Sequence, residues 1–190
     1  WMVYLFTHGI PMILGDEMGL GKTLQTIAFI AHLKFALNIS GPHLVLCPLS
    51  VLSSWLSEFK RWCPSLKTAR FHSSSKNARE GLMKEILTNF DKYDVIITTY
   101  EMALTMRHLV VWRSVILDEG HKLKNEETRI AIKMRSVRSQ SRIILTGTPL
   151  QNNLKELWSL LNYLLPDIFK SSKVFENAFD LTHSAVDSDL

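Results

Sequence analysis

The chain has 190 residues, of which 46% are hydrophobic, and 22 Lys and Arg against 18 Asp and Glu give a formal net charge of +4. That length suits one domain with a buried core, and the ordinary hydrophobic fraction excludes an intrinsically disordered chain. Two cysteines, Cys47 and Cys63, are too few for a disulfide framework or a four-cysteine zinc site. The longest uncharged stretch, residues 35–57, is interrupted by glycine and proline, so we expect no membrane span.

The charge is unevenly distributed along the chain. Nine basic and four acidic residues lie between Arg107 and Arg142, so this segment carries +5 and the remainder −1. One interpretation is a solvated helix face, which is the usual explanation of a charge run. The other is a surface that faces phosphates. Charge alone favours the solvated face and leaves the other interpretation open.

Short runs rich in Val, Ile and Leu recur without alternating with polar residues, as is typical of strands buried on both faces of a parallel sheet. They predict strands at residues 12–14, 43–47, 94–98, 114–117 and 142–145. Segments with helical spacing predict helices at residues 22–35, 50–62, 76–90, 101–109, 126–137 and 153–165. This alternation predicts an α/β fold: a three-layer sandwich around a mainly parallel sheet with right-handed crossovers. Weak periodicity after residue 169 predicts a poorly ordered end.

The strongest local signal is the segment 16–23 (DEMGLGKT), between a predicted strand and a predicted helix. Gly19 and Gly21 let the backbone curl around an anion, and the start of the helix adds partial positive charge. We expect Lys22 to reach the β- and γ-phosphates of a nucleotide and Thr23 to offer its hydroxyl to Mg²⁺. The strict pattern begins with Gly where this chain has Asp16. By pattern alone this weakens the match, but the position between a strand and a helix makes a glycine-rich turn that merely caps a helix the minority alternative.

An apolar run over residues 115–117 ends in two acids, Asp118 and Glu119. In a phosphate-loop enzyme, Asp118 would hold Mg²⁺ through water, and Glu119 would orient or deprotonate the attacking water. His121 follows two residues later, where it is placed to sense the γ-phosphate or a neighbouring loop. The alternative is a strand that simply emerges into solvent, but the phosphate loop favours the functional interpretation.

Two further polar clusters follow predicted strands. Thr146, Gly147 and Thr148 come directly after the last strand, and Thr99 and Tyr100 after an earlier one. Ligands of open α/β sheets bind at the carboxyl edge of the strands, where both clusters are expected. Ordinary turn and capping chemistry is the alternative for each.

Taken in order, these segments resemble the motifs of the SWI/SNF-like chromatin-remodelling ATPases, a branch of the superfamily-two helicase-like proteins. The resemblance rests on residues 16–23 (DEMGLGKT), 44–55 (LVLCPLSVLSSW), 98–101 (TTYE), 118–121 (DEGH), 145–153 (LTGTPLQNN) and 158–162 (WSLLN). Within that family, the motifs resemble most those of the imitation-switch and chromodomain-helicase groups. It implies a recombinase-like P-loop NTPase lobe over residues 1–169, with residues 170–190 starting the segment between two lobes.

The resemblance also implies ATP and Mg²⁺ as cofactors, and double-stranded DNA and nucleosomes as partners of a nuclear protein. The implied ATP-site residues are Asp16, Gly19, Leu20, Gly21, Lys22, Thr23, Thr146, Gly147 and Thr148. The implied catalytic residues are Lys22, Asp118, Glu119 and His121, with Thr23 and Asp118 on Mg²⁺. The implied DNA track, which mostly touches phosphates, comprises Pro48, Leu49, Ser50, Thr99, Tyr100 and Lys124.

Some family features are not in this sequence. Residue 1 is Trp, the adenine-reading motif is not present, and Gly120 stands where many relatives have alanine. The second lobe, whose arginine fingers are worth about 10³–10⁵ in rate, is not present either. We therefore expect the isolated lobe to be nearly inactive without that lobe in cis. Two alternatives stay open: a strand-separating helicase, and a catalytically silent nucleotide-binding or protein-interaction module, which has no need of Glu119.

Overall fold

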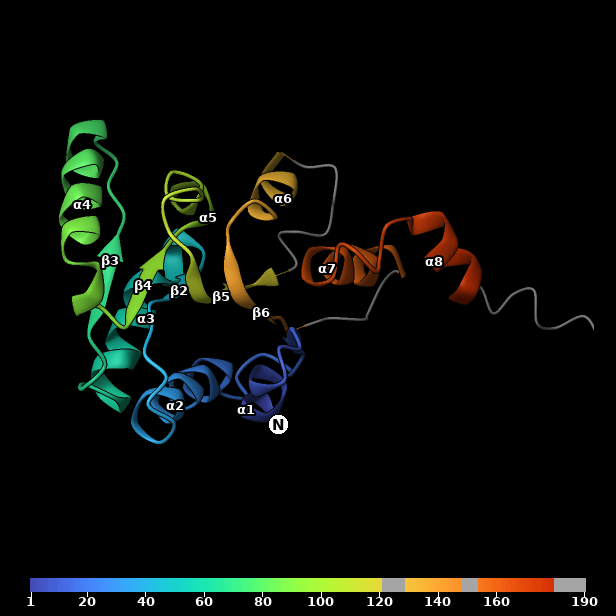
Figure 1. The fold of residues 1–190 in the computed structure, drawn as a ribbon, viewed down its shortest axis with the longest axis horizontal. Coiled ribbons are helices and arrows are strands. Elements are labelled where there is room, and N and C mark those ends of the chain that lie inside the picture. The colour runs from blue at the N-terminus through green and yellow to red at the C-terminus, as the bar shows by residue number, and fades with distance from the viewer. Residues whose placement is uncertain (121–128, 148–153, 180–190) are drawn as a thin grey trace, which may run out of the picture.

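A six-stranded sheet, parallel at every pairing, forms the centre of the computed structural model, which describes residues 1–120, 129–147 and 154–179 (Figure 1). The strands are β1 (Met12–Leu14), β2 (His43–Leu46), β3 (Thr68–Phe71), β4 (Val95–Thr98), β5 (Trp112–Asp118) and β6 (Ser139–Leu145). Their spatial order is β1-β6-β5-β2-β4-β3. Since parallel neighbours must be joined by crossovers, helices are required on the faces of the sheet.

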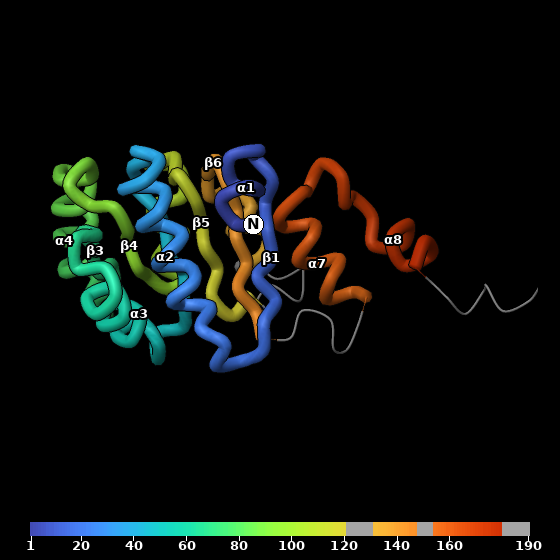
Figure 2. Tube along the Cα trace, turned by 90° about the horizontal axis from the view of Figure 1, so that it is seen from below, coloured from blue at the N-terminus to red at the C-terminus, as the bar shows by residue number. Residues whose placement is uncertain are grey.

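The helices occupy both faces. They are α1 (Met2–Thr7), α2 (Lys22–Phe35), α3 (Leu49–Trp62), α4 (Lys76–Thr88), α5 (Tyr100–Ala103), α6 (Arg129–Met134), α7 (Leu154–Leu164) and α8 (Ser172–Phe179), with a 3-10 turn at Phe90–Lys92. Figure 2, seen from below, shows α1, α2 and α3 in front of the strands, and α5 and α6 lie on the other side in Figure 1. The predicted three-layer α/β sandwich is confirmed.

The core consists of two apolar clusters, one on each side of the sheet. Within β5, Val115 and Leu117 belong to the cluster that α4 to α7 cover. Ile116, between them, belongs to the cluster that α1, α2 and α3 cover. Because successive side chains of a strand point to opposite faces, a strand covered on both sides must be apolar at every position. This explains the non-alternating runs in the sequence.

The sequence did not predict β3 or α1. Within β3, Ala69 and Phe71 are buried while Thr68 and Arg70 are more exposed, so the strand alternates instead of forming an apolar run. It lies at the end of the sheet and pairs only with β4. An edge strand has less of its surface covered and tolerates polar residues. β3 therefore lacks the continuous apolar run that predicted the other five strands.

Element ends also differ from the prediction. The helix predicted at 101–109 is the shorter α5, which ends at Ala103 and continues as turns, with the Thr105 N–H donating to the Met102 carbonyl at 3.1 Å. The prediction of poor order after residue 169 was wrong for Ser172–Phe179, which form α8, with Phe175 packed edge-on against Phe169 at 5.8 Å between ring centroids. Residues 180–190 lie outside the described part. No helix in that described part is long and apolar enough to cross a membrane.

Candidate functional site

The register of the sheet brings the predicted polar segments to one edge. Asp118 at the end of β5 is level with Leu145 at the end of β6, and Leu46 of β2 is level with Leu117 and with Thr98 of β4. The chain segments that follow all these strands therefore leave the sheet on the same side. This is the carboxyl edge, where open α/β sheets bind their ligands.

The phosphate loop has the backbone geometry that its glycines predicted. Gly19 and Gly21 have φ values of 86° and 74°, and Gly21 is the residue that caps α2. This left-handed region is easily accessible only to glycine. Lys22 turns back onto the loop, where its ammonium donates hydrogen bonds to the carbonyl oxygens of Asp16 at 2.8 Å and Glu17 at 2.9 Å. The loop thus encloses the ammonium with which a phosphate would pair.

Asp16, which replaces the first glycine of the strict pattern, has a structural partner. The Gln25 side-chain amide donates to the Asp16 carboxylate at 3.1 Å and to the Leu20 carbonyl at 3.1 Å. Gln25 lies one helical turn after Gly21, so its amide fastens the loop to the first turns of α2. Gln25 was not predicted, because the phosphate-loop pattern ends before it.

Three hydrogen bonds hold Asp118 at the end of β5. The Trp55 indole N–H donates to Oδ2 at 2.7 Å, the Glu119 backbone N–H donates to Oδ1 at 3.0 Å, and the Tyr100 hydroxyl donates to the main-chain carbonyl at 2.6 Å. Burial raises the pKa of the Asp118 carboxyl, and the charge of Glu119 adds to the rise. The bonds from Trp55 and the Glu119 N–H, and the charge of Lys22, act to lower the same pKa.

Glu119 adopts a φ of 56°, which is uncommon for a residue other than glycine. Such conformations cost free energy and cluster at functional sites. The phosphate loop and the carboxylate pair line one pocket of about 420 Å³, which Glu58 and Trp62 of α3 complete. The Trp62 indole donates to Glu58 at 2.6 Å, and Trp62 is 47% exposed. Neither α3 residue was predicted, because helical periodicity assigns them no chemistry.

The cluster after β6 reaches the phosphate loop. A Cβ added to Gly147 would lie 2.9 Å from the Met18 Cγ, so a larger residue would require the exposed Met18 side chain to shift. Thr146 is buried, and its backbone N–H donates to the Leu14 carbonyl at 3.1 Å. The predicted site residues Thr148, His121 and Lys124 lie outside the described residues.

The predicted DNA-contact residues fall into two groups. Pro48 caps α3, and Leu49 and Ser50 in its first turn are exposed. Thr99 and Tyr100 are only 5% and 2% exposed. The buried Tyr100 hydroxyl points to Asp118, so this side chain supports the pocket from below the surface.

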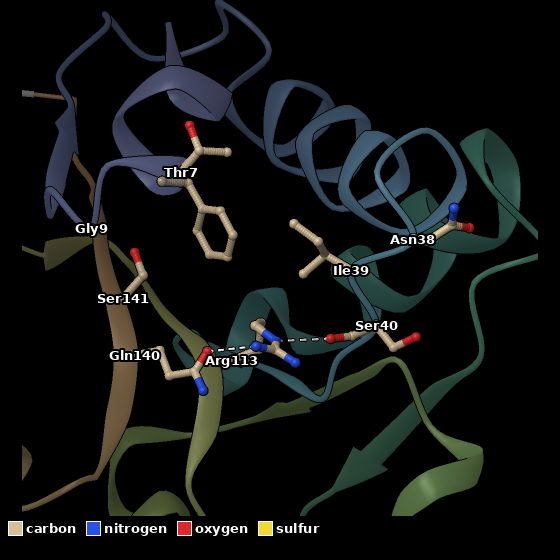
Figure 3. A pocket seen from close by; sticks show the side chains of 9 residues that line it. Thr7, Gly9, Asn38, Ile39, Ser40, Arg113, Gln140 and Ser141 are labelled. Carbon is tan, nitrogen blue, oxygen red and sulfur yellow. Dashed lines mark hydrogen bonds between the residues drawn. The ribbon is translucent and has the colours of Figure 1, made fainter.

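The basic segment is partly structural. Arg107 and Arg142 donate to the main-chain carbonyls of Leu104 and Tyr163, each at 2.7 Å. Arg113 donates to the Ser40 carbonyl at 3.0 Å and to the Gln140 side chain at 2.6 Å. It lines a second cavity of about 660 Å³ between α1, the segment after α2 and the starts of β5 and β6 (Figure 3). These three arginines are bound to groups of the protein itself, so their charge needs no phosphate partner to account for it. That cavity lies at the opposite edge of the sheet from the phosphate loop.

The residues of the carboxyl edge fit a nucleotide with Mg²⁺. Thr23 and Asp118, both on the pocket wall, offer the hard oxygen donors that Mg²⁺ prefers. In the described ranges, no group of three or more His, Cys, Asp or Glu side chains forms a metal cage. Mg²⁺ at nucleotide sites is held by one or two protein oxygens together with phosphates and water, so the small donor set is the expected one.

The chain is similar to proteins of a known family. A family model described as SNF2-related domain matches residues 1–189. The chain is 45% identical over its whole length to human "SWI/SNF-related matrix-associated actin-dependent regulator of chromatin subfamily A member 1", covering 18% of that protein. It is 43% identical to "ISWI chromatin-remodeling complex ATPase CHR11" of Arabidopsis thaliana, over 96% of this chain and 17% of that protein. The chain thus spans less than a fifth of these two relatives.

A solved structure shows the same fold. The "Sulfolobus solfataricus SWI2/SNF2 ATPase core in complex with dsDNA" matches 99% of this chain and 38% of its own, with a TM-score of 0.82 and 36% identity. The predicted recombinase-like P-loop fold is therefore confirmed.

Proposed function

The chain belongs to the SNF2-related domain family, and we propose that it is the N-terminal ATP-binding lobe of a DNA-dependent ATPase that moves along double-stranded DNA and remodels nucleosomes. The observation that carries the proposal is the pocket that the phosphate loop shares with Asp118 and Glu119. The relatives are named as chromatin-remodelling proteins, and the solved relative is in complex with double-stranded DNA. Both facts support the proposed role on DNA and nucleosomes. We extend this proposal to a nuclear location and to residues 1–169 as the lobe.

In this proposal, the charged and polar groups of the loop have distinct binding tasks. Lys22 exchanges the carbonyls of Asp16 and Glu17 for the β- and γ-phosphates, while the backbone N–H groups from Gly19 to Gly21 face the same phosphates. Thr23 would offer its hydroxyl to Mg²⁺, and Asp118 would hold the ion through water. When bound, that ion neutralises the charge that develops on the phosphates.

Glu119 is the proposed residue that orients or deprotonates the attacking water. Its left-handed backbone places it beside Asp118 on the wall of the pocket. The second lobe, in cis, would add the arginines that stabilise the transferring phosphoryl group, worth about 10³–10⁵ in rate. The lobe alone is therefore expected to turn over ATP very slowly.

The exposed start of α3, with Pro48, Leu49 and Ser50, is the proposed DNA contact from this lobe. Thr99, Tyr100 and Lys124 remain predictions for the same track, as His121 and Thr148 do for the nucleotide site. Since phosphates dominate such a contact, DNA affinity should fall steeply as salt rises. A salt-insensitive affinity would contradict the phosphate track.

The test is Glu119→Gln in the full-length protein. Nucleotide binding should be retained while DNA-stimulated hydrolysis is abolished, because the amide cannot accept the proton of the attacking water. Glu85→Gln, at an exposed position of α4, is the matched control and should leave turnover unchanged. Unchanged turnover in Glu119→Gln would refute the assignment of Glu119. A wild-type protein that binds nucleotide without hydrolysing it would indicate the catalytically silent module.

A further inference from the structure

Two helices reach the same residue of the candidate site from different parts of the chain. Trp55 of α3 donates its indole N–H to the Asp118 carboxylate at 2.7 Å. Tyr100, the first residue of α5, donates its hydroxyl to the Asp118 main-chain carbonyl at 2.6 Å. Both α3 and α5 begin at segments proposed or predicted to contact DNA. Asp118 is therefore the point at which these segments meet the metal-binding side of the pocket.

The contact from α3 is rigid. Trp55 is 2% exposed and packs against Phe59 of the same helix, with ring centroids 6.1 Å apart. An indole has a single donor, so once the ring is packed its N–H has only one direction. The other carboxylate oxygen accepts the Glu119 backbone N–H, which fixes the carboxylate at both ends. Each oxygen still has a lone pair for a metal-bound water.

The start of α3 is exposed, whereas Thr99 and Tyr100 at the start of α5 are buried and Glu101 is the first exposed residue of that helix. Leu49 and Ser50 are exposed in the first turn of α3, and Trp55 follows them by less than two turns. Packed interiors are hardly compressible, so a helix moves as a unit. A displacement of the first turn of α3 on DNA contact would therefore also move the Trp55 ring. The distance between the proposed DNA contact and the carboxylate is thus bridged by one helix and one hydrogen bond.

We propose that Trp55 is a positioning residue that ties α3, and with it the engagement of DNA, to the orientation of the Asp118 carboxylate. Tyr100 supplies a second tie, from α5 to the Asp118 main chain. The inference rests on the proposed function, since it concerns how DNA stimulates hydrolysis at the same pocket. Trp55 touches neither nucleotide nor water in this scheme, and it acts only through Asp118.

The test compares two Trp→Phe substitutions in the full-length protein. Trp55→Phe removes the N–H and keeps an aromatic ring in the core. Trp112→Phe makes the same change at a buried position at the opposite end of β5, about 20 Å from Asp118 at ~3.3 Å per residue. Loss of a residue that orients a metal ligand costs roughly 10- to 100-fold in activity or metal affinity. Trp55→Phe should show that loss in DNA-stimulated kcat and need more Mg²⁺ for half-maximal rate, whereas Trp112→Phe should show neither.

A second pair of variants removes only a hydroxyl. Tyr100→Phe deletes the donor to Asp118 without a change in shape, and it should reduce DNA stimulation in the same direction. Tyr163→Phe is its control, because the Tyr163 hydroxyl is buried without a hydrogen-bond partner among the residues described here. If Trp55→Phe does not fold, as thermal melting would show, the hydroxyl pair decides the question.

The outcomes separate the two proposals. Hydrolysis that DNA does not stimulate in the wild-type protein would overturn the proposed function itself. Stimulated wild-type hydrolysis, with Trp55→Phe and Tyr100→Phe both matching their controls, would overturn the inference and leave the function standing. A loss of rate without a changed Mg²⁺ requirement would also overturn it, because a purely structural role for Trp55 gives that result.

Discussion

The Lys22 ammonium lies 2.8 Å from the carbonyl oxygen of Asp16, so the phosphate loop is closed around its own lysine. The same group donates to Glu17 at 2.9 Å. Both acceptors are neutral carbonyls. Phosphate oxygens carry negative charge and add Coulomb attraction to a hydrogen bond from the ammonium, so they compete effectively with these carbonyls. Nucleotide binding therefore requires an exchange of partners at Lys22 within an already curved loop.

Replacing Lys22 with alanine should weaken nucleotide binding by about 10- to 100-fold, the equivalent of one hydrogen bond to a charged group. Titration with a fluorescent nucleotide measures this effect. Lys84→Ala, at an exposed position of α4, should leave the affinity unchanged. Equal affinities for the two variants would mean that Lys22 does not leave its loop carbonyls when nucleotide binds.

The parts of the site that the sequence predicted are local in the chain. Gly19, Gly21 and Lys22 work through their own backbone and through groups within a few residues, so a short pattern captures them. The strands were predictable for a similar reason, since burial on both faces requires an apolar residue at every position. The edge strand β3 has no such requirement and was missed.

The support of Asp118 was not predictable from the sequence. Trp55 lies 63 positions from Asp118 and Tyr100 lies 18 positions away. Helical periodicity identifies Trp55 only as a core residue, because its N–H adds nothing to an apolar pattern. Tyr100 was predicted to face DNA, whereas burial directs its hydroxyl inward. Only the register of β5 between β2 and β6 brings these groups together.

A second prediction concerns the ion pair at the start of β4. The Lys34 ammonium donates to both carboxylate oxygens of Asp94, at 2.7 and 2.6 Å, and the Lys67 backbone N–H donates to one of them at 2.8 Å. The Asp94 side chain is 11% exposed and that of Lys34 is 26% exposed. The carboxylate is therefore the partner that has less access to water.

Removing Lys34 should cost more than neutralising Asp94. Lys34→Met leaves the buried Asp94 carboxylate with the Lys67 backbone N–H as its remaining donor in the described part of the chain. It should lower the free energy of unfolding by about 2–3 kcal/mol. Asp94→Asn frees an ammonium that can reach water, and should cost about 1–2 kcal/mol. Lys92→Met, which loses only an exposed bond to Asn89, is the control and should stay within about 0.5 kcal/mol of wild type. Denaturant unfolding measures all three, and the reverse order of the first two would refute this account.

A third prediction follows from the buried His43 at the start of β2. The ring is 1% exposed, and its Nδ1 lies 2.6 Å from the Ser114 hydroxyl. The pKa of His43 is lowered from 6.5 to about 4, mainly by burial and also by the charge of Arg113, while the charge of Asp94 opposes the shift. The folded state therefore keeps this histidine neutral over a pH range in which the unfolded chain binds a proton.

Stability should accordingly fall as the pH decreases from 6.5 towards 4. In that window the unfolded state gains the proton first, and the loss reaches about 2 kcal/mol at pH 5, at about 1.4 kcal/mol per pH unit. His43→Asn retains a polar partner for Ser114 but cannot titrate, so its free energy of unfolding should decline less over the same range. Urea unfolding of both proteins at pH 7.5, 6 and 5 isolates this contribution. Parallel curves would show that His43 is not its source.

The fourth prediction concerns Gly120, which directly follows the carboxylate pair Asp118 and Glu119. A Cβ built on Gly120 would collide with the Cγ2 methyl of Ile144, a fully buried residue of β6. Because that methyl is attached to a branched Cβ inside the sheet, it cannot turn aside without moving the strand. Gly120→Ala should therefore destabilise the fold by about 1–3 kcal/mol, the usual cost of overpacking.

A double-mutant cycle with Ile144→Ala tests the cause, since that substitution removes the Cγ2 methyl. In the Ile144→Ala background, adding Gly120→Ala should cost almost nothing, because the new methyl occupies the vacated space. Gly81→Ala, in α4 and with open space around its Cα, is the matched control and should stabilise the protein by roughly 0.5–1 kcal/mol through helix propensity. If Gly120→Ala costs the same in both backgrounds, the collision with Ile144 is not what keeps glycine at this position.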